Sequence, residues 1–541
     1  MHIKNRTDSP QWRARVPYIE GWRQAGFYAG RNLAREMQAG LARHGETRAV
    51  FVVERQVRET TANELWQDAG KIAGALAARG LRAGDVIVNQ LPNCRETMLI
   101  FIAALRLGLI VVPVIHIYGA NELGYILRAS RAKALAMPSR WGKIDFPERV
   151  RALGDLPDLE MIIAVGGGSL PGPSLAWEEL EAHRGPAPEL STAHGDDICL
   201  MNFTSGTTSA PKGVMHSHHS LIAAALTVPP VEVDVRGAPA LRIGPAGHIA
   251  AIQGLPRAFL LGDEMIHVDQ FEPGLVLELC ERFKAKRSAG VPTHFLSLIE
   301  ASGGRMPESL KILLLGGASV PPAIIEHFEK FGVTAVRSWG CTEHPTITSG
   351  EPSDSLHKRA STDGRVAKHN YVRAVDDEGR EVPRGQAGEL LSLGPKMFQG
   401  YLDASLDAAA FTDDGFYRTG DIGVIDADGY VTIVDRKKDI VVRGGENISS
   451  REVEDLLMRH PAVFEAAVVG WPDERMGERV GVFVQLKAGA ALSLEEVREH
   501  FSRLGVAVQK TPERLVVVDD LPRNPTGKVI KTELRKKARG N

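Results

Sequence analysis

The chain has 541 residues, of which 43% are hydrophobic and 24% are charged, and its formal net charge is −2. This length exceeds what one hydrophobic core ordinarily serves, so two or more domains are expected. The near-neutral charge excludes a global basic field of the kind that attracts nucleic acid, and the composition is that of a soluble globular enzyme.

The cysteines favour a reduced, cytoplasmic setting. None forms a CxxC pair or a spacing typical of metal ligands, so neither disulfides nor thiolate metal sites are expected. The N-terminal residues carry no apolar core of the signal-peptide type. The four cysteines are Cys94, Cys199, Cys280 and Cys341.

Helix and strand patterns alternate through the first third of the chain. Residues 64–79 place apolar side chains at the spacing of an amphipathic helix, and residues 86–88 are typical of a buried strand. The most apolar run is expected to form a buried helix, 96–107, and a buried strand, 109–114, because Arg106 and other breaks shorten it below a membrane span. This alternation, which continues to about residue 165, predicts a parallel, layered α/β architecture.

A strand-like run over 198–203 then breaks into hydroxyl residues and glycine, 204–209, before Pro211 and Lys212. A loop of this composition can turn backbone N–H groups inward to bind anions, and its hydroxyls and lysine add donors suited to phosphate. A polyphosphate site is therefore predicted, and an ordinary surface turn is the alternative. The loop is not a Walker A motif, because Pro211 precedes the lysine and Gly213 follows it.

Two features follow this loop. His216, His218 and His219 could suggest a metal site, but no carboxylate or thiol lies nearby, so a polar helix entry is the preferred interpretation. Residues 244–254 are small and apolar, with His248 as one of two large polar groups. They could form the floor of a pocket or a tightly packed core turn.

Two later strands end in residues suited to a nucleotide. Residues 311–319 have the pattern of a strand that ends in glycines. Residues 334–343 have the pattern of a short strand followed by Trp339, Thr342 and Glu343. Such strand ends are where α/β sheets place ligands. The tryptophan can stack on a base, the threonine can donate to phosphate and the glutamate can hold Mg²⁺. Ordinary strand ends with a buried tryptophan are the alternative.

The last part of the chain carries further candidates. Residues 417–430 predict a strand, a turn and a strand, with Asp421 at the end of the first strand, where its carboxylate can accept from vicinal hydroxyls or cap a turn. The charged break at 435–439 suggests a domain junction. A smaller α+β unit follows, and its closing turn, 521–528, displays Lys528.

Taken in order, these segments resemble the acyl-adenylate-forming (ANL) superfamily, and within it the acyl-CoA synthetases, which are AMP-dependent acid–CoA ligases. The resemblance covers nearly the whole chain, and chance agreement of six spaced motifs is negligible. The motifs are Thr204-Ser-Gly-Thr-Thr-Ser-Ala-Pro-Lys-Gly213, Trp339-Gly-Cys-Thr-Glu343, Tyr417-Arg-Thr-Gly-Asp421, Asp435-Arg-Lys-Lys-Asp439, Gly444-Gly-Glu-Asn447 and Pro525-Thr-Gly-Lys528.

The resemblance implies an α/β fold with a large N-terminal domain, residues 1–437, and a small mobile α+β domain, residues 438–541. The large domain would contain two sheets packed with helices plus a distorted β-barrel. Two half-reactions are implied: a carboxylate attacks the α-phosphate of MgATP to give acyl-AMP and pyrophosphate, and a thiol, usually that of CoA, displaces AMP. ATP, Mg²⁺ and CoA would be the cofactors.

The resemblance also assigns roles to individual residues. The catalytic set would be Lys528, Thr342, Glu343 and Lys212. The nucleotide set would be Thr204, Ser205, Gly206, Thr207, Thr208, Lys212, Gly316, Gly317, Ala318, Trp339, Thr342, Asp421, Arg436 and Lys528. Magnesium would be held by Glu343 and Thr204. The acyl group would meet His248, Gly247, Val291, Gly340 and His344.

Domain rotation between the half-reactions is implied as well. Lys438 would be the hinge, and rotation would withdraw Lys528 and bring a loop to the thiol. That loop contains Gly444, Gly445 and Glu446. The chain departs from the family pattern where Ser209 replaces a glycine and where Trp339 replaces a tyrosine while keeping a stacking face.

The acid and its acceptor are less well defined. Amino-acid-activating relatives pair the substrate amine with an aspartate in the segment matching 244–254, and this segment has none, so a plain carboxylic acid is expected. Medium-chain fatty, alicyclic and aromatic acids fit equally. Three functions stay open: an acid–CoA ligase, a stand-alone acyl-AMP ligase loading a carrier protein, and a nucleotide-binding regulatory protein that has lost catalysis. No nucleic acid and no membrane segment are expected, and a homodimer is left open.

Overall fold

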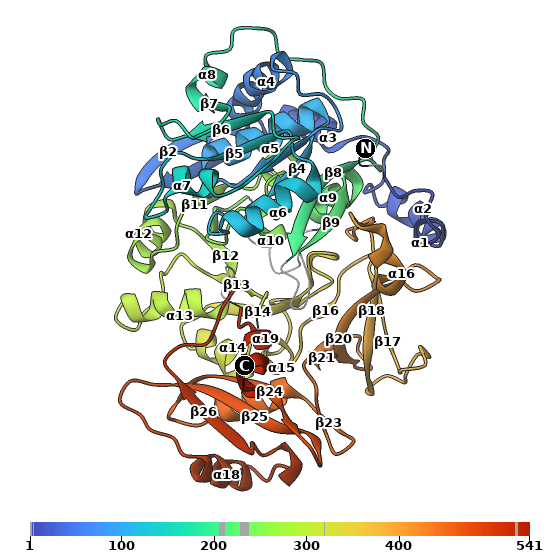
Figure 1. Cartoon of the computed structure of the whole chain (residues 1–541), viewed down its shortest axis with the longest axis vertical. Coiled ribbons are helices and arrows are strands. Elements are labelled where there is room, and N and C mark those ends of the chain that lie inside the picture. Colours follow the sequence, from blue (N-terminus) through green and yellow to red (C-terminus); the bar gives the residue numbers. More distant parts are fainter. Residues whose placement is uncertain are drawn as a thin grey trace. The chain divides into compact units, whose positions relative to one another are not determined.

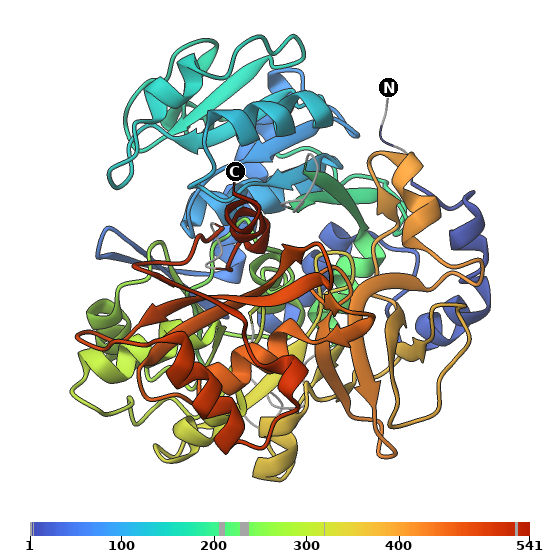
Figure 2. The same cartoon turned by 60° about the horizontal axis from the view of Figure 1, so that its bottom comes forward.

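The computed structural model describes residues 3, 5–204, 211–227, 237–318, 320–524 and 528–540. The chain divides into two compact units, whose elements are labelled in Figure 1 and seen again from below in Figure 2. Unit 1 consists of Met1–Gly206, Ala210–Tyr371 and Ser392–Tyr417, and unit 2 of Thr207–Ser209, Val372–Leu391 and Arg418–Asn541. The boundary of a mobile domain between residues 437 and 438 stays a prediction.

Unit 1 contains an eight-stranded sheet. Its strand order is β19 (Gly400–Tyr401), β9 (Lys212–Ser217), β8 (Ile198–Thr204), β4 (Ile110–Pro113), β3 (Val86–Asn89), β5 (Ala134–Pro138), β6 (Met161–Val165) and β7 (Ser174–Ala176). The pairs from β8 to β7 are parallel, whereas β8 pairs with β9, and β9 with β19, in antiparallel fashion. The parallel arrangement predicted from the alternating pattern is confirmed.

Helices cover both faces of this sheet because successive strand residues point to opposite sides. Val86 and Val88 pack in a cluster with α6 (Ala120–Ser130), whereas Ile87 between them packs with α4 (Ala62–Ala78) and α5 (Arg95–Leu107). The predicted buried helix and strand at 96–114 therefore correspond to α5 and β4. Two shorter helices of this region are α7 (Phe146–Arg151) and α8 (Trp177–Glu181).

The second sheet of unit 1 has nine strands. Their order is β16 (Arg365–Val366), β15 (Thr348–Ser349), β14 (Thr334–Trp339), β13 (Ile312–Leu315), β12 (Arg287–Gly290), β10 (Ala240–Arg242), β11 (Met265–Val268), β1 (Arg48–Val53) and β2 (Gln56–Thr61). One face packs on α12 (Pro273–Phe283), α13 (Pro292–Ala301) and α14 (Pro322–Glu329). The opposite face of the nine-stranded sheet contributes to the same core as α4 and α5. The helices α4 and α5 therefore lie between the two sheets of unit 1.

The remaining helices of unit 1 are mostly short, and several of them, including residues 33–44, pack into the same core as α4 and α5. They are α1 (Pro10–Arg13), α2 (Val16–Gln24), α3 (Leu33–His44), α9 (His218–Leu226), α10 (Ile249–Ile252), α11 (Arg257–Leu260), α15 (Leu356–Ser361) and α16 (Asp407–Ala410). Across the part of the chain that the structure describes, no helix combines the length and apolar character needed to cross a bilayer.

Unit 2 contains two sheets. One is a four-stranded sheet with the order β17 (Tyr371–Val375), β18 (Ala387–Leu393), β20 (Tyr417–Ile425) and β21 (Val431–Arg436). The distorted barrel expected in the large domain stays a prediction. The other sheet has the order β23 (Glu446–Ile448), β22 (Val441–Arg443), β25 (Gly477–Leu486) and β24 (Val463–Asp473), with β26 (Arg514–Val518) parallel to β25. Three helices complete the unit: α17 (Ser450–Leu457), α18 (Leu494–Arg503) and α19 (Lys531–Ala538). The mixed α/β class, with a smaller α+β part, is confirmed.

Candidate active site

The predicted phosphate site begins where β8 ends and β9 starts. Thr204 lies directly opposite Lys212 in the antiparallel register of these strands. The Lys212 ammonium lies 5.1 Å from the centre of the Tyr401 ring, within the range of a cation–π contact. The structure therefore brings two of the predicted phosphate ligands together. Four other predicted ligands, Ser205, Gly206, Thr207 and Thr208, lie outside the described residues, as does Ser209.

The loop that follows β14, which we call the 340–347 loop, is a tight turn. The Ile347 N–H donates to the Trp339 carbonyl at 2.8 Å, and the Cys341 N–H donates to the His344 carbonyl at 3.1 Å. A Cβ added at Gly340 would lie 2.4 Å from the Thr346 nitrogen, so only glycine fits there. Thr346 has a φ of 49°, which for a β-branched residue costs about 1–2 kcal/mol unless its neighbours hold it.

Glu343, the predicted magnesium ligand, is anchored on both its backbone and its side chain. The Phe398 N–H donates to its carbonyl at 2.8 Å, and the Tyr401 hydroxyl donates to its Oε1 at 2.8 Å. Burial and the Glu343 carboxylate raise the pKa of the Tyr401 phenol, so it stays a proton donor. Sequence analysis does not identify Tyr401, because 58 residues separate it from Glu343 and no local pattern links them.

Thr342, the predicted α-phosphate ligand, is fixed from behind by His216. The Nε2 atom of His216 lies 2.8 Å from the Thr342 carbonyl oxygen, and its Nδ1 lies 3.2 Å from the Ser220 Oγ. Burial lowers the pKa of His216 to about 4, so the ring is neutral and Nε2 carries the proton that the carbonyl accepts. The polar helix entry inferred from the sequence is confirmed, because α9 begins at His218 with Ser217 as its N-cap, and His216 at the end of β9 has a structural role in addition.

The other two neighbouring histidines point elsewhere. The His218 Nδ1 accepts from the Leu33 N–H at 3.3 Å, and the His219 Nδ1 lies 2.9 Å from Asp196 Oδ1. Their partners differ from those of His216, so the three rings do not converge. No group of three His, Cys, Asp or Glu side chains that could hold a metal occurs among the described residues.

The predicted adenine shelf and Trp339 lie on neighbouring strands. β13 pairs with β14 in parallel, with Leu315 opposite Arg337, so Gly316 and Gly317 leave β13 beside the end of β14. Ala318 follows them, and Ser319 lies outside the described residues. The carboxyl ends of parallel strands meet at one edge of a sheet, and such an edge is a common ligand site in α/β proteins. The sequence prediction grouped these residues correctly on the sheet, and their contact with a base stays a prediction.

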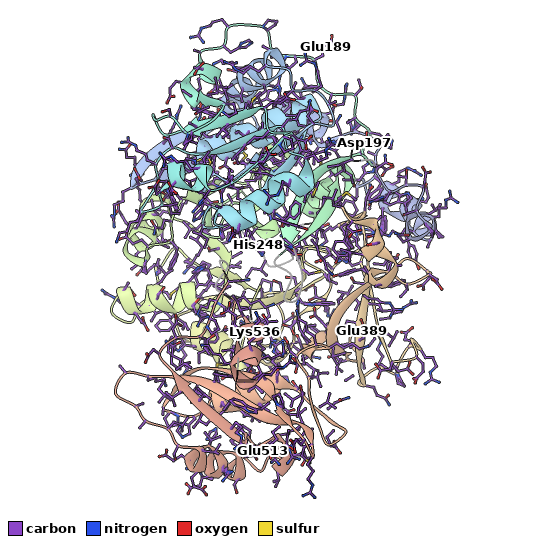
Figure 3. The ribbon with its side chains drawn as sticks, in the orientation of Figure 1. Glu189, Asp197, His248, Glu389, Glu513 and Lys536 are labelled. Carbon is purple, nitrogen blue, oxygen red and sulfur yellow. The ribbon has the colours of Figure 1, made fainter. Side chains whose placement is uncertain are left out.

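The predicted acyl floor is rigidly held. A Cβ at Gly247 would lie 2.4 Å from the backbone nitrogen of Ile115, and its carbonyl accepts from the Asn202 amide at 2.9 Å. His248, labelled in Figure 3, caps α10 by accepting the Ala250 N–H on Nδ1 at 3.2 Å. Within residues 244–254, Ile249–Ile252 therefore form a short capped helix, which the sequence analysis did not predict.

Of the other three predicted acyl residues, Gly340 belongs to the 340–347 loop, and Val291 and His344 differ in exposure. Val291 is the residue before α13 and is partly buried. His344 is fully buried, and its Nδ1 lies 3.0 Å from the Ser392 Oγ. Burial lowers the pKa of His344 well below its ordinary value, so it is neutral in the core. A direct contact between His344 and a substrate stays a prediction.

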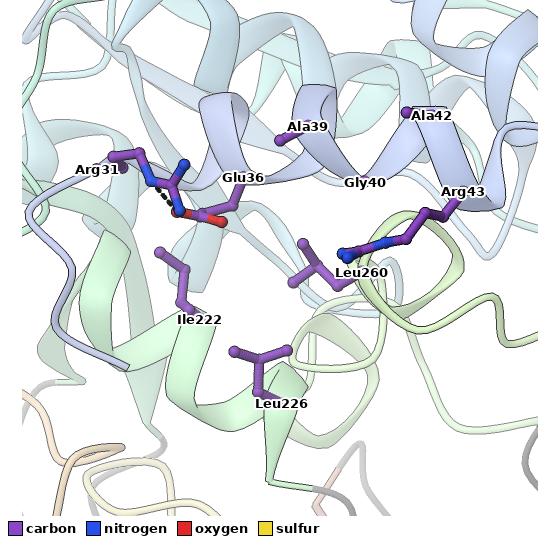
Figure 4. A pocket seen from close by; sticks show the side chains of 9 residues that line it. All are labelled: Arg31, Glu36, Ala39, Gly40, Ala42, Arg43, Ile222, Leu226 and Leu260. Carbon is purple, nitrogen blue, oxygen red and sulfur yellow. Dashed lines mark ion pairs between the residues drawn. The ribbon is translucent and has the colours of Figure 1, made fainter. Parts of the chain in front are cut away.

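A half-open cavity of about 460 Å³ lies elsewhere in unit 1, among α3, α9 and α11. Figure 4 shows the ion pair of Arg31 with Glu36 at one end and Arg43 at the other, above the apolar side chains of Ile222 and Leu226. None of the predicted site residues lines this cavity.

Unit 2 contains three of the predicted residues, Asp421, Arg436 and Lys528, and the first two form an ion pair. Arg436 Nε lies 2.8 Å from Asp421 Oδ1 across β20 and β21. Asp421 is inside β20 and not at its end, which corrects the sequence prediction: the strand continues through Gly420 to Ile425. The positive charge of Arg436, followed by burial, lowers the pKa of Lys528 to about 8. Pro525, Thr526 and Gly527 lie outside the described residues.

The predicted hinge and thiol-side loop are also defined within unit 2. The Lys438 carbonyl accepts from Arg535 at 3.0 Å, and the same guanidinium pairs with Asp439 at 2.5 Å. Gly444 and Gly445 connect β22 to β23 and have φ values of 59° and 89°, as in a type I′ hairpin turn that leads into Glu446. Their roles in catalysis stay predictions.

Comparison with known proteins covers both parts of the chain. The family described as AMP-binding enzyme matches residues 37–402, and the AMP-binding enzyme C-terminal domain matches residues 452–528. One similar protein is the medium-chain fatty-acid–CoA ligase of Escherichia coli K12, which is 34% identical over 527 residues, covering 95% of this chain and 92% of the relative.

Solved structures of ligand complexes are similar over nearly the full length. An anthranilate CoA ligase in complex with anthranoyl-AMP has a TM-score of 0.85 and 26% identity, covering 94% of this chain and 98% of that chain. The O-succinylbenzoate coenzyme A synthetase of Bacillus subtilis, in complex with ATP and magnesium ion, has a TM-score of 0.78 and 25% identity, covering 93% and 99%.

Proposed function

From the premise that the chain belongs to the AMP-binding enzyme family, in the acyl-CoA synthetase branch of the acyl-adenylate-forming superfamily, we propose that it is an AMP-forming acid–CoA ligase. It activates an organic acid with ATP through an acyl-AMP and transfers the acyl group to CoA. The observation that carries this proposal is the 340–347 loop, in which His216 and Tyr401 fix Thr342 and Glu343 beside the end of β14.

The first half-reaction needs charge placement more than covalent help from the protein. A carboxylate is a poor electrophile, and its attack on the α-phosphate of ATP gives an acyl-AMP with a good leaving group and releases pyrophosphate. Anionic oxygen develops in the transition state, so fixed donors and cations aimed at the phosphates are the main source of rate. Lys212 and Thr204 are proposed to hold the β- and γ-phosphates, and Thr342 the α-phosphate.

The oxygen-rich donor set also fits a magnesium ion. Glu343 and Thr204 are proposed to hold it, because a buried carboxylate and a hydroxyl are ligands that Mg²⁺ accepts. The bound ion neutralises phosphate charge. The Tyr401 hydroxyl fixes one oxygen of Glu343 and so orients the carboxylate.

Unit 2 is proposed to supply the ribose contacts and the catalytic ammonium. The buried carboxylate of Asp421 can accept hydrogen bonds from the two ribose hydroxyls, and the guanidinium of Arg436, its ion-pair partner, can donate to the same hydroxyls. Lys528 is proposed to bridge the carboxylate and α-phosphate oxygens in the first half-reaction. The thiol must then enter where this lysine stood, so rotation about Lys438 would bring the hairpin of Gly444 and Gly445 to CoA.

The class of acid is proposed from the floor of the pocket and from the relatives. Residues 244–254 contain no aspartate that could pair a substrate amine, which supports an acid without an α-amino group. The relatives' names cover medium-chain fatty and aromatic acids, so either class is a candidate substrate. A cytoplasmic location is part of the proposal, supported by four cysteines that are not in disulfides.

A lysine substitution tests the proposal directly. Lys528→Ala should lower acid-dependent pyrophosphate release by about 10²–10³-fold, the scale of losing one charge-stabilising donor. Lys536→Ala is a matched control, because Lys536 is an exposed lysine of α19 in the same unit; its activity should stay within about twofold of the parent enzyme. Near-parental AMP formation in Lys528→Ala would remove Lys528 from the mechanism.

A further inference from the structure

Lys396 is a buried cation that the mechanism above does not use. Along the chain it follows β18 and precedes β19, in the part that belongs to unit 1, and it is only 1% exposed. Its Nζ donates to the carbonyl oxygen of Thr346 at 2.5 Å. Sequence analysis gives no signal for this residue, because 50 positions separate the two partners.

Thr346 is the strained end of the loop that carries the predicted nucleotide ligands. Its backbone is left-handed, with a φ of 49°, and its nitrogen is in tight contact with Gly340. Its hydroxyl accepts from the Gln253 amide at 3.4 Å, and the next carbonyl, of Ile347, accepts from Asn370 at 3.0 Å. Lys396 therefore binds the carbonyl of the same residue that carries the unusual backbone angle.

A lysine at this place needs an explanation. A buried ammonium loses its hydration, and an apolar side chain of the same length usually packs in such a site with equal or better stability. Consistent with this cost, burial lowers the pKa of Lys396 to about 7. Either protonation state keeps an N–H that can donate to Thr346, so the contact persists across the neutral pH range.

We propose that Lys396 is a positioning residue that holds the 340–347 loop in the conformation presenting Thr342 and Glu343 to the nucleotide. It touches neither the substrate nor the reacting atoms, and it acts through the Thr346 carbonyl. The inference rests on the proposed function, because it assigns Lys396 to the first half-reaction, in which the α-phosphate and the magnesium ion take part.

Two variants and a control test this role. Lys396→Met removes the donor and keeps an apolar side chain of similar length. Thr346→Gly should make the contact with Lys396 less important, because glycine adopts a positive φ without strain and the loop then needs no outside group to keep this angle. Arg106→Met is the control: Arg106 is 7% exposed and also donates to a carbonyl, that of Trp66 at 3.2 Å, within the packing of α4 on α5.

The first readout is hydrogen exchange, which needs no activity. In Lys396→Met, the Cys341 and Ile347 amides should exchange faster by about tenfold or more, while peptides outside the loop keep parental rates. Arg106→Met should leave the loop amides unchanged. Unchanged loop exchange in Lys396→Met would overturn the proposal, and so would an equal increase throughout unit 1, which would mark a merely structural role.

The second readout separates the half-reactions. Lys396→Met should lower the maximal rate of pyrophosphate release by about 10–100-fold, the effect of a loop displaced by about 1 Å, and should change thioester formation from supplied acyl-AMP less than about threefold. In a Thr346→Gly background the loss caused by Lys396→Met should shrink by at least about threefold. Equal losses in both half-reactions, or an undiminished loss in that background, would overturn the inference. If the parent enzyme releases no pyrophosphate with any acid, the proposed function fails, and the exchange data still decide the role of Lys396.

Discussion

The pKa of Lys528 gives the most detailed prediction. Arg436 is the largest cause that lowers this pKa from its ordinary value of 10.5 to about 8. If the protonated lysine stabilises the first transition state, adenylation should lose rate as the pH rises through about 8. Arg436→Gln removes the neighbouring positive charge and should move this alkaline limb upward.

The size of the shift follows from the fraction of protonated lysine. With a pKa of about 8, about one-tenth of Lys528 is protonated at about pH 9, so the parental rate there should be about one-tenth of its plateau. A rise of about one unit in the variant leaves about half of the lysine protonated, so the relative rate at about pH 9 should be about five times higher.

The assay is pyrophosphate release between about pH 6.5 and 9.5 at saturating ATP and acid. Saturation matters because Arg436 is also proposed to grip the ribose, and its loss should raise the KM for ATP. Arg436→Lys is the matched control: it keeps the positive charge, so its alkaline limb should stay near the parental position. Identical midpoints in the parent enzyme and Arg436→Gln would refute the reasoning.

Three further predictions concern the hinge, the loop and the buried lysine. Lys438→Pro should spare acyl-AMP formation and block thioester formation, and equal loss of both steps, measured separately, would count against the hinge. Gly340→Ala places a methyl group 2.4 Å from the Thr346 nitrogen and should lower pyrophosphate release by about 10²-fold or more, whereas parental activity would show that the loop can move aside. The pKa of Lys396 is about 7 in the folded protein and 10.5 in its ordinary state. Between these two values the unfolded chain binds the proton and the folded chain does not, so the free energy of unfolding should rise with pH. Relative to Lys396→Met, the free energy of unfolding of the parent, from denaturant titration, should rise by about 2 kcal/mol between about pH 6 and 8.5; parallel curves would contradict the buried ammonium.

Local patterns predicted the elements well where one face of a helix or strand meets the core. The helices α4 and α5 and the strands β3 and β4 follow from the apolar spacing of residues 64–114. Strand order did not follow, because pairs such as β1 with β11 join segments about 200 residues apart. Asp421 was misplaced for a related reason: the sequence analysis put it at the end of its strand, but pairing with β21 carries β20 on to Ile425.

The residues of the candidate site fall into two groups, those that the sequence could identify and those that it could not. Residues inside long motifs, such as Thr342, Glu343 and Arg436, could be named from the sequence because their order along the chain resembles a known family. Their supporting residues could not. The sequence analysis singled out His216 only as one of three clustered histidines, and Tyr401 and Lys396 carry no local signal, because only the folded chain brings these side chains to the 340–347 loop. Motifs identify groups that touch ligands, whereas long-range packing identifies the groups that hold them.

The most direct test is a stoichiometric assay of the purified full chain with ATP, Mg²⁺ and a panel of medium-chain and aromatic acids, with and without CoA. The account predicts that ATP is consumed only when a suitable acid is present, that pyrophosphate and AMP form in equal amounts, and that CoA becomes an acyl thioester in the same amount. Failure to consume ATP with every acid would contradict it, and so would acid-dependent pyrophosphate release that leaves CoA unacylated.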